Sequence, residues 1–156
     1  MRIRLLAILL ALLPALCATA KTKAETPEWV SRCKPLEDAI EDVTKSKIYD
    51  EKALTRIFQL NRQFATCDDG SYGEGISDVT VKALAQSYQG VVKLASEDKG
   101  MLAFILKHID STTDLNDLDR VSQNSIHQCP KSRKKICKQI ERAAKAASKE
   151  AHNAGK

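Results

Sequence analysis

The chain has 156 residues, a formal net charge of +5 and only seven aromatic residues. This length supports one compact domain with a modest hydrophobic core and argues against a second domain. With so few aromatic residues, the core must consist mostly of leucine, isoleucine, valine and alanine, which pack well between helices.

The first twenty residues have the pattern of an export signal. Arg2 and Arg4 precede an apolar run from Leu5 to Leu13, and the small residues of Ala18-Thr19-Ala20 suit a signal peptidase. The apolar run is too short to span a bilayer. We therefore expect cleavage after Ala20 and a soluble periplasmic domain over residues 21–156 that does not span the membrane.

Two alternatives to simple cleavage stay open. An uncleaved anchor or a buried helix would also use the apolar run, although the polar Lys21-Thr22-Lys23 argues against it. Lipidation of Cys17 is the second alternative. Lipoprotein processing prefers a small residue before the cysteine, and Leu16 stands there.

Four cysteines follow the leader: Cys33, Cys67, Cys129 and Cys137. An even number in an exported chain predicts two disulfides, and four cysteines allow three pairings. We expect Cys129–Cys137 to clip the start of the last helix, which leaves Cys33–Cys67 to tie the first helix to the segment after the second. A zinc site is disfavoured, because there is no Cys-x-x-Cys pair and His127-x-Cys129 lacks a second correctly spaced pair.

Apolar residues recur at helical spacing after the leader, and no strand-like alternation of useful length occurs. We therefore predict an all-α fold, a compact bundle of about six or seven helices stapled by two disulfides. The first helix follows Pro35, or begins near Thr26-Pro27 with Pro35 as a kink. The second helix has its N-cap at Asp50 and ends at Cys67.

Residues 68–75 read Asp-Asp-Gly-Ser-Tyr-Gly-Glu-Gly, with three glycines among eight residues. Such a segment predicts either an internally tight turn or a backbone that a partner approaches closely. A third helix is expected from about Ser77 to Tyr88, and Gly90 marks its end or a bend.

The second half of the chain predicts further helices. Ser96 is the expected N-cap of a helix whose apolar residues from Met101 to Ile109 cover most of its circumference, as in a central core helix. Thr113 or Asp114 caps the next helix, and the last helix begins after Pro130.

The charge is unevenly distributed, because nine basic and only two acidic residues follow from Lys131 onward. A basic helix suits nucleic acid, an anionic membrane surface or an acidic partner, or it is simply a solvated face. Export makes nucleic acid the least expected partner.

No catalytic set is visible in the sequence. Cysteines in disulfides are not nucleophiles, and His108, His127 and His152 are isolated. There is neither a Gly-x-Ser-x-Gly elbow nor a phosphate-binding loop. Acidic residues cluster in two loops, 68–78 and 110–119, but neither matches a calcium-binding loop. We therefore predict no enzymatic activity, no cofactor and no metal.

Residues 67–78, together with the downstream pattern Phe104-x-x-x-His108-Ile109-Asp110-x-Thr112, resemble the periplasmic immunity proteins that neutralise type VI secretion amidase effectors. The resemblance spans Leu54 to Cys137. It implies a small helical protein, often a homodimer, that binds a secreted cell-wall amidase and blocks its active-site cleft with a protruding loop.

The resemblance does not show which residues of this chain would form the inhibitory loop. The candidate partner-binding residues are therefore chosen on physical grounds, with Tyr72 as the aromatic anchor: Asp68, Asp69, Ser71, Tyr72 and Glu74. The alternative function is a non-enzymatic envelope accessory protein that binds anionic lipid or polymer through the basic last helix.

Overall fold

The computed structural model describes residues 28–154, which form seven α-helices and two short 3-10 helices without any β-strand. The elements in chain order are α1 (Glu28–Ser46), α2 (Glu51–Gln63), η1 (Ala65–Cys67), α3 (Gly70–Gln86), α4 (Tyr88–Glu97), α5 (Lys99–Lys107), α6 (Leu115–His127), η2 (Lys131–Arg133) and α7 (Lys134–Ala154). The all-α prediction is confirmed. The expected leader, its cleavage after Ala20 and Cys17 lie outside the described residues.

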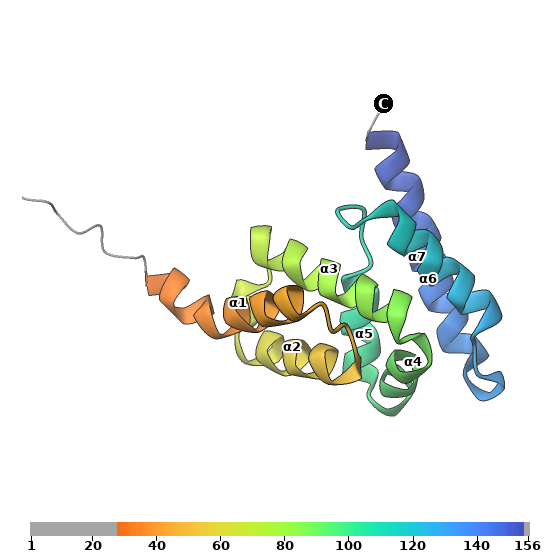
Figure 1. Cartoon of the computed structure of the whole chain (residues 1–156), viewed down its shortest axis with the longest axis horizontal. Coiled ribbons are helices and arrows are strands. Elements are labelled where there is room, and N and C mark those ends of the chain that lie inside the picture. Colours follow the sequence, from red (N-terminus) through yellow and green to blue (C-terminus); the bar gives the residue numbers. More distant parts are fainter. Residues whose placement is uncertain (1–27, 155–156) are drawn as a thin grey trace, which may run out of the picture.

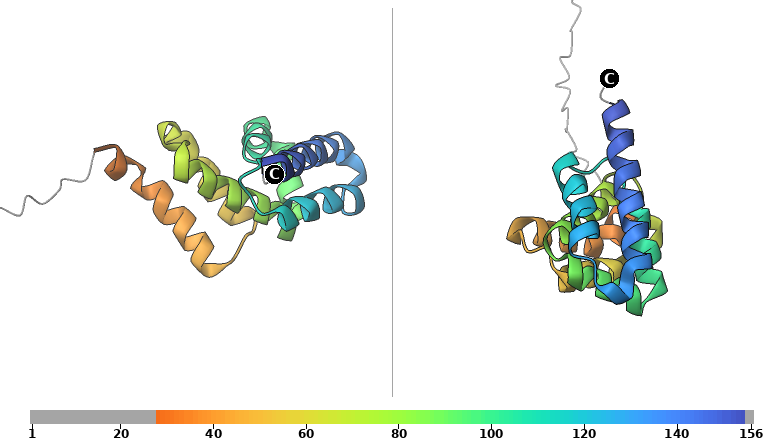
Figure 2. Two further views of the ribbon diagram at one scale, coloured as in Figure 1. Left: turned by 90° about the horizontal axis from the view of Figure 1, so that it is seen from above. Right: turned by 90° about the vertical axis from the view of Figure 1, so that its right-hand side faces the viewer.

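The helices form two groups (Figure 1). Helices α1, α2 and the first turns of α3 lie at one end of the molecule, and α6 and α7 form an antiparallel pair at the other (Figures 1 and 2). Helix α3 connects the two groups, since it contacts α1, α2, α4 and α6.

The core is organised around α3, and the prediction that residues 101–109 form the central helix is wrong. Three consecutive α3 residues, Val79, Thr80 and Val81, are almost fully buried, and in the middle of the helix only the side through Asp78 and Lys82 stays partly exposed. Helix α5 has only nine residues and buries Met101, Phe104 and Ile105. The hydrophobic pattern of the sequence does not identify α3 as the central helix, because several of its buried residues are small or polar, namely Ser77, Thr80, Ala83 and Ala85.

Several predicted helix boundaries are confirmed. The Asp50 carboxylate accepts a hydrogen bond from the Ala53 N–H at 2.8 Å and caps α2. Asp114 caps α6 by accepting from the Asn116 N–H at 2.9 Å. Helix α1 runs through Pro35, in agreement with the earlier of the two predicted starts.

Three other expected boundaries are wrong. Helix α2 ends at Gln63 and not at Cys67, which lies in η1. Ser96 lies in the last turn of α4, where its hydroxyl donates to the Lys93 carbonyl, and the N-cap of α5 is Asp98, whose carboxylate accepts from the Gly100 N–H at 2.7 Å. Aspartate at position 98 therefore takes the capping role predicted for Ser96. Gly90 lies inside α4, not at the end of α3.

Both predicted disulfides are present. Cys33–Cys67 joins α1 to η1 with an S–S distance of 2.03 Å, and Cys129–Cys137 joins the connection after α6 to the first turn of α7 with an S–S distance of 2.05 Å. Each bond restricts the unfolded chain and thereby stabilises the fold.

Helix α6 holds the carboxyl end of α3. The side-chain amide of Asn124 donates to the carbonyls of Leu84 and Ala85, at 3.3 and 3.0 Å. The last carbonyls of a helix lack partners within the helix, so Asn124 satisfies groups that would otherwise be buried without one. Ser125, the residue after Asn124, accepts a hydrogen bond from the Tyr88 hydroxyl at 2.9 Å.

We expect Asn124→Ala to lower the free energy of unfolding by about 1–3 kcal/mol, because it removes the donor to buried carbonyls. Urea denaturation measures the change. The exposed neighbour Gln123 provides the control, and Gln123→Ala should change the value by less than about 0.5 kcal/mol. Equal losses in the two variants would contradict the assignment.

Candidate functional site

The glycine-rich segment forms the first turns of α3, and the prediction of a turn over residues 68–75 is wrong. Asp69 has an extended backbone and caps the helix, since its carboxylate accepts from the Gly70 N–H at 2.7 Å. Gly70 has a φ of +52°, the left-handed conformation that favours glycine. The chain thus enters α3 through a single residue with special backbone geometry.

Gly75 allows a close approach of α1 to α3. A Cβ atom at this position would lie 3.0 Å from Cγ2 of Ile40 on α1. A Cβ at Gly73 would meet no atom closer than 3.8 Å. The close approach expected for this segment is therefore made by the protein's own first helix.

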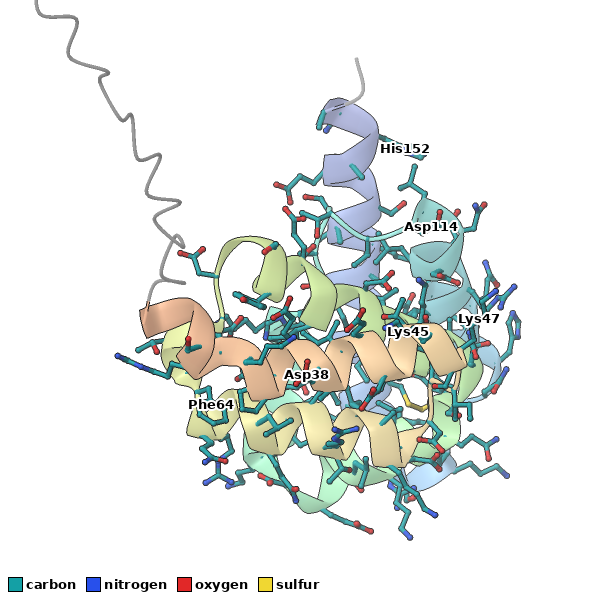
Figure 3. All side chains as sticks on the ribbon, turned by 60° about the vertical axis from the view of Figure 1, so that its left-hand side comes forward. Asp38, Lys45, Lys47, Phe64, Asp114 and His152 are labelled. Atoms are coloured by element: carbon teal, nitrogen blue, oxygen red, sulfur yellow. A yellow bond between two sulfur atoms is a disulfide. The ribbon has the colours of Figure 1, made fainter. Side chains whose placement is uncertain are left out.

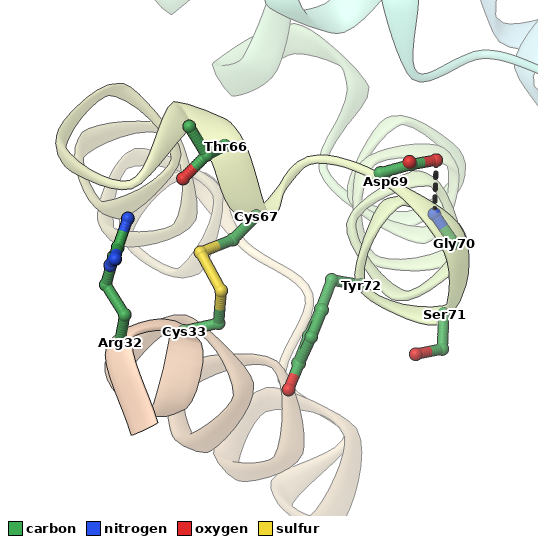
Figure 4. A pocket seen from close by; sticks show the side chains of 8 residues that line it. All are labelled: Arg32, Cys33, Thr66, Cys67, Asp69, Gly70, Ser71 and Tyr72. Atoms are coloured by element: carbon green, nitrogen blue, oxygen red, sulfur yellow. Dashed lines mark hydrogen bonds between the residues drawn. A yellow bond between two sulfur atoms is a disulfide. The ribbon is translucent and has the colours of Figure 1, made fainter. Parts of the chain in front are cut away.

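Two hollows open between α1 and α3, and Ser71 and Tyr72 line both of them. The disulfide hollow, of about 370 Å³, is also lined by Arg32, Cys33, Thr66, Cys67, Asp69 and Gly70. The α1 hollow, of about 520 Å³, is also lined by Glu37, Ile40, Glu41, Thr44 and Lys45. In Figure 4 the side chain of Tyr72 points from α3 toward α1, beside the disulfide. Tyr72 is half-buried and stands between the two hollows.

The outer face of α1 adds charge beside these hollows (Figure 3). Lys45 pairs with Glu41 at 2.7 Å, and Lys34 pairs with Asp38 at 2.7 Å. These are exposed pairs one helical turn apart, which contribute little to stability. The rim of the α1 hollow therefore carries both signs of charge in accessible positions.

The structure separates the five predicted contact residues. Asp69, Ser71 and Tyr72 lie together in the wall of the disulfide hollow. Glu74 is exposed on the same helix but lines neither hollow. Asp68 differs from the others, because its side chain is only 8% exposed and is directed toward α5.

Asp68 belongs to a buried polar network behind the hollows. Its Oδ2 lies 2.5 Å from Nζ of Lys107 and 3.4 Å from Nε2 of His108. Nδ1 of His108 lies 3.3 Å from the Ser77 hydroxyl, which donates to Asp110 at 2.5 Å. The network therefore joins the start of α3, the end of α5 and the loop before α6.

The charge states in this network have physical causes. Burial lowers the pKa of His108, although the neighbouring Asp68 carboxylate acts in the opposite direction. Burial would raise the pKa of Asp68, but the hydrogen bond from Lys107 and the proximity of the Asn61 amide and of His108 bring that pKa below its usual value. At neutral pH the pair is therefore a neutral imidazole beside an ionised carboxylate.

The contacts from Asp68 to His108 and from His108 to Ser77 have the order of a catalytic proton relay. These side chains, however, hold the helices together. Ser77 and His108 are 1% and 2% exposed, so neither faces a hollow. The Ser77 hydroxyl donates to Asp110 and is not directed at a substrate. His108 looks isolated in the sequence, and the only signal of its role there is its place two residues before Asp110 in the pattern at 104–112.

The described part of the chain contains no group of three or more histidine, cysteine, aspartate or glutamate side chains placed to hold a metal ion. Across residues 28–154, none of the helices is both long and apolar enough to cross a membrane.

The two glycines of α3 give a matched pair of variants. Gly73→Ala should raise the free energy of unfolding by about 0.5–1 kcal/mol, because alanine restricts the unfolded chain and favours helix. Gly75→Ala should lower it by about 1 kcal/mol, because the added methyl group meets the stiff β-branched Ile40. Thermal or urea denaturation compares them. Stabilisation by both substitutions would contradict the close packing of α1 on α3.

Stability should depend on pH through His108, whose pKa lies below its ordinary value of 6.5 in the folded protein. The unfolded chain then binds a proton more readily, so the free energy of unfolding falls as the pH drops below about 6.5 and levels off once folded His108 is also protonated. Urea denaturation across this pH range should show a smaller decline in His108→Asn than in the exposed control His127→Asn. The opposite order would contradict the assignment.

No protein-family model, curated protein or solved structure matches this chain significantly. The functional interpretation therefore depends on the geometry of the surface around Tyr72 and on the sequence resemblance.

Proposed function

We propose that this chain is a periplasmic immunity protein that binds a type VI secretion peptidoglycan amidase and blocks its active site. The observation that supports this function best is the position of Tyr72, half-buried between two adjoining hollows on a surface fixed by a disulfide. Large aromatic side chains at the centre of a shaped surface are typical anchors of protein interfaces.

This surface is ordered before any partner binds. The Cys33–Cys67 disulfide ties α1 to η1 in the wall of one hollow, and the contact between Gly75 and Ile40 fixes α1 against α3. A preordered surface loses less conformational entropy on binding, and this increases affinity. An inhibitor that blocks an active site by covering it requires such a rigid surface but needs no catalytic groups.

The accessible groups suit a protein partner. The ring of Tyr72 offers apolar area, and the two hollows can receive side chains of the partner. The exposed carboxylates of Asp69 and Glu74 provide hydrogen-bond acceptors nearby. Asp68 supports this surface from behind through Lys107 and His108 and is not itself a contact residue in this proposal.

The location proposed for the protein agrees with its covalent structure. Disulfides persist in oxidising compartments such as the periplasm, and this chain contains two. A cell-wall amidase delivered by type VI secretion would act in the same compartment. A homodimer, which the resemblance implies, stays a prediction.

The test is the affinity of the protein for a cell-wall amidase encoded beside its own gene. We expect Tyr72→Ala to weaken binding by about 30-fold, the change that corresponds to a loss of about 2 kcal/mol at an interface anchor. Tyr72→Phe keeps the ring and should lose less. Isothermal titration calorimetry measures the affinity, and release of cell-wall peptides measures inhibition of the amidase.

Ile48 provides the control, because it is a large apolar side chain that is 59% exposed and lines neither hollow. Ile48→Ala should bind and inhibit as the unmodified protein does. If the unmodified protein neither binds nor inhibits the amidase, the proposed function is wrong. If the Tyr72 and Ile48 variants lose equal amounts of binding, the proposed function stands, but the surface around Tyr72 is not the one that contacts the amidase.

A further inference from the structure

Helix α7 carries a continuous cationic stripe along its exposed side. We define the α7 stripe as the six exposed basic residues Lys134, Lys135, Lys138, Arg142, Lys145 and Lys149. With 3.6 residues per turn, these positions fall within an arc of about 100° and extend over about 22 Å of the helix axis. The stripe therefore presents its charges to one side of the molecule.

The opposite side of α7 is fully used by the fold. Cys137, Ile140, Ala144 and Ala147 are buried, and α7 packs along α6. The apolar face is therefore covered and cannot enter a bilayer as that of a free amphipathic helix does. A partner that binds the exposed side of α7 therefore contacts its charged side chains and not an apolar face.

Little of that charge is neutralised within the molecule. Lys145 pairs with Glu141 at 2.6 Å, and this exposed pair is weak. The other five stripe residues form no ion pair with any residue in the described range. The two acidic residues of α7 lie outside the arc of the stripe, Glu141 about 20° beyond one edge and Glu150 about 60° beyond the other, and leave its centre uniformly positive.

The shape of the stripe favours a flat surface over a flexible chain. It lies on the convex side of an exposed helix, whereas proteins that bind extended polyanions usually hold them in a positively charged groove. A plane of headgroups can meet all six charges without bending, and each basic residue near an anionic bilayer adds to the attraction. The free end of α7 also projects beyond the rest of the molecule, so the body does not shield it (Figures 1 and 2).

We propose that the α7 stripe binds the anionic headgroups of a lipid bilayer and holds the protein on the membrane surface without insertion. The surface around Tyr72 lies on α1 and α3, at the other end of the molecule, and stays accessible in this arrangement. The proposal is independent of the amidase partner, because it uses different residues and a different ligand.

The experiment uses protein purified from cells that express the full chain, and it measures cosedimentation with vesicles. One set of vesicles contains phosphatidylcholine with phosphatidylglycerol, and the other contains phosphatidylcholine alone. We expect binding to the anionic vesicles only, with a steep decrease as salt concentration rises. The triple variant Lys138→Gln, Arg142→Gln, Lys149→Gln should bind on the order of 100-fold more weakly, at about fivefold for each basic residue removed.

The matched control removes three exposed lysines outside the stripe, Lys52, Lys93 and Lys99, and has the same net charge as the stripe variant. It should keep most of the binding, and circular dichroism should show both variants folded. Equal losses in the two triple variants would overturn the proposal, because net charge alone would explain them. Binding to soluble dextran sulfate but not to anionic vesicles would also overturn it and would assign the stripe to a polymer.

Discussion

The burial of most of the second half of α3 is the constraint on which the rest of the structure depends. Polar groups in the buried part of a helix cannot hydrogen-bond to water, so neighbouring elements supply the partners of Ser77 and of the last α3 carbonyls. Asn124 of α6 provides the donor at the carboxyl end, and His108 and Asp110, which follow α5, meet Ser77 in the middle of the helix. Helices α5 and α6 are thereby fixed relative to α3.

The candidate binding surface lies where α3 leaves this environment. Its first turns emerge beside α1, and the geometry there is set by Gly70, by the Gly75 contact with α1 and by the Cys33–Cys67 disulfide. Tyr72 is placed by these constraints and not by a flexible loop. The same rigid body carries the α7 stripe at its other end, so the two proposed contacts, with a membrane surface and with a protein partner, do not compete for the same residues.

Much of the fold could be predicted from local pattern. Helical periodicity and the Asp50 and Asp114 caps depend on neighbouring residues, and two disulfides follow from the even number of cysteines. These predictions are confirmed, and so is the pairing that we expected among the three possible ones. The central role of α3 could not be predicted, because buried Ser77 and Thr80 look like surface residues until their surroundings are known. For the same reason Asp68 was grouped with Asp69, although cap geometry turns their side chains toward different parts of the molecule.

The central claim is that the surface shared by α1 and the first turns of α3 is the one that meets the amidase. Hydrogen–deuterium exchange on the complex with the amidase encoded beside this gene tests it most directly, because amide protection reports the contact surface without any substitution. We expect new protection in residues 69–75 and in the part of α1 that lines the hollows, with little change in α7. Protection confined to α7 or to the α6–α7 connection would contradict it.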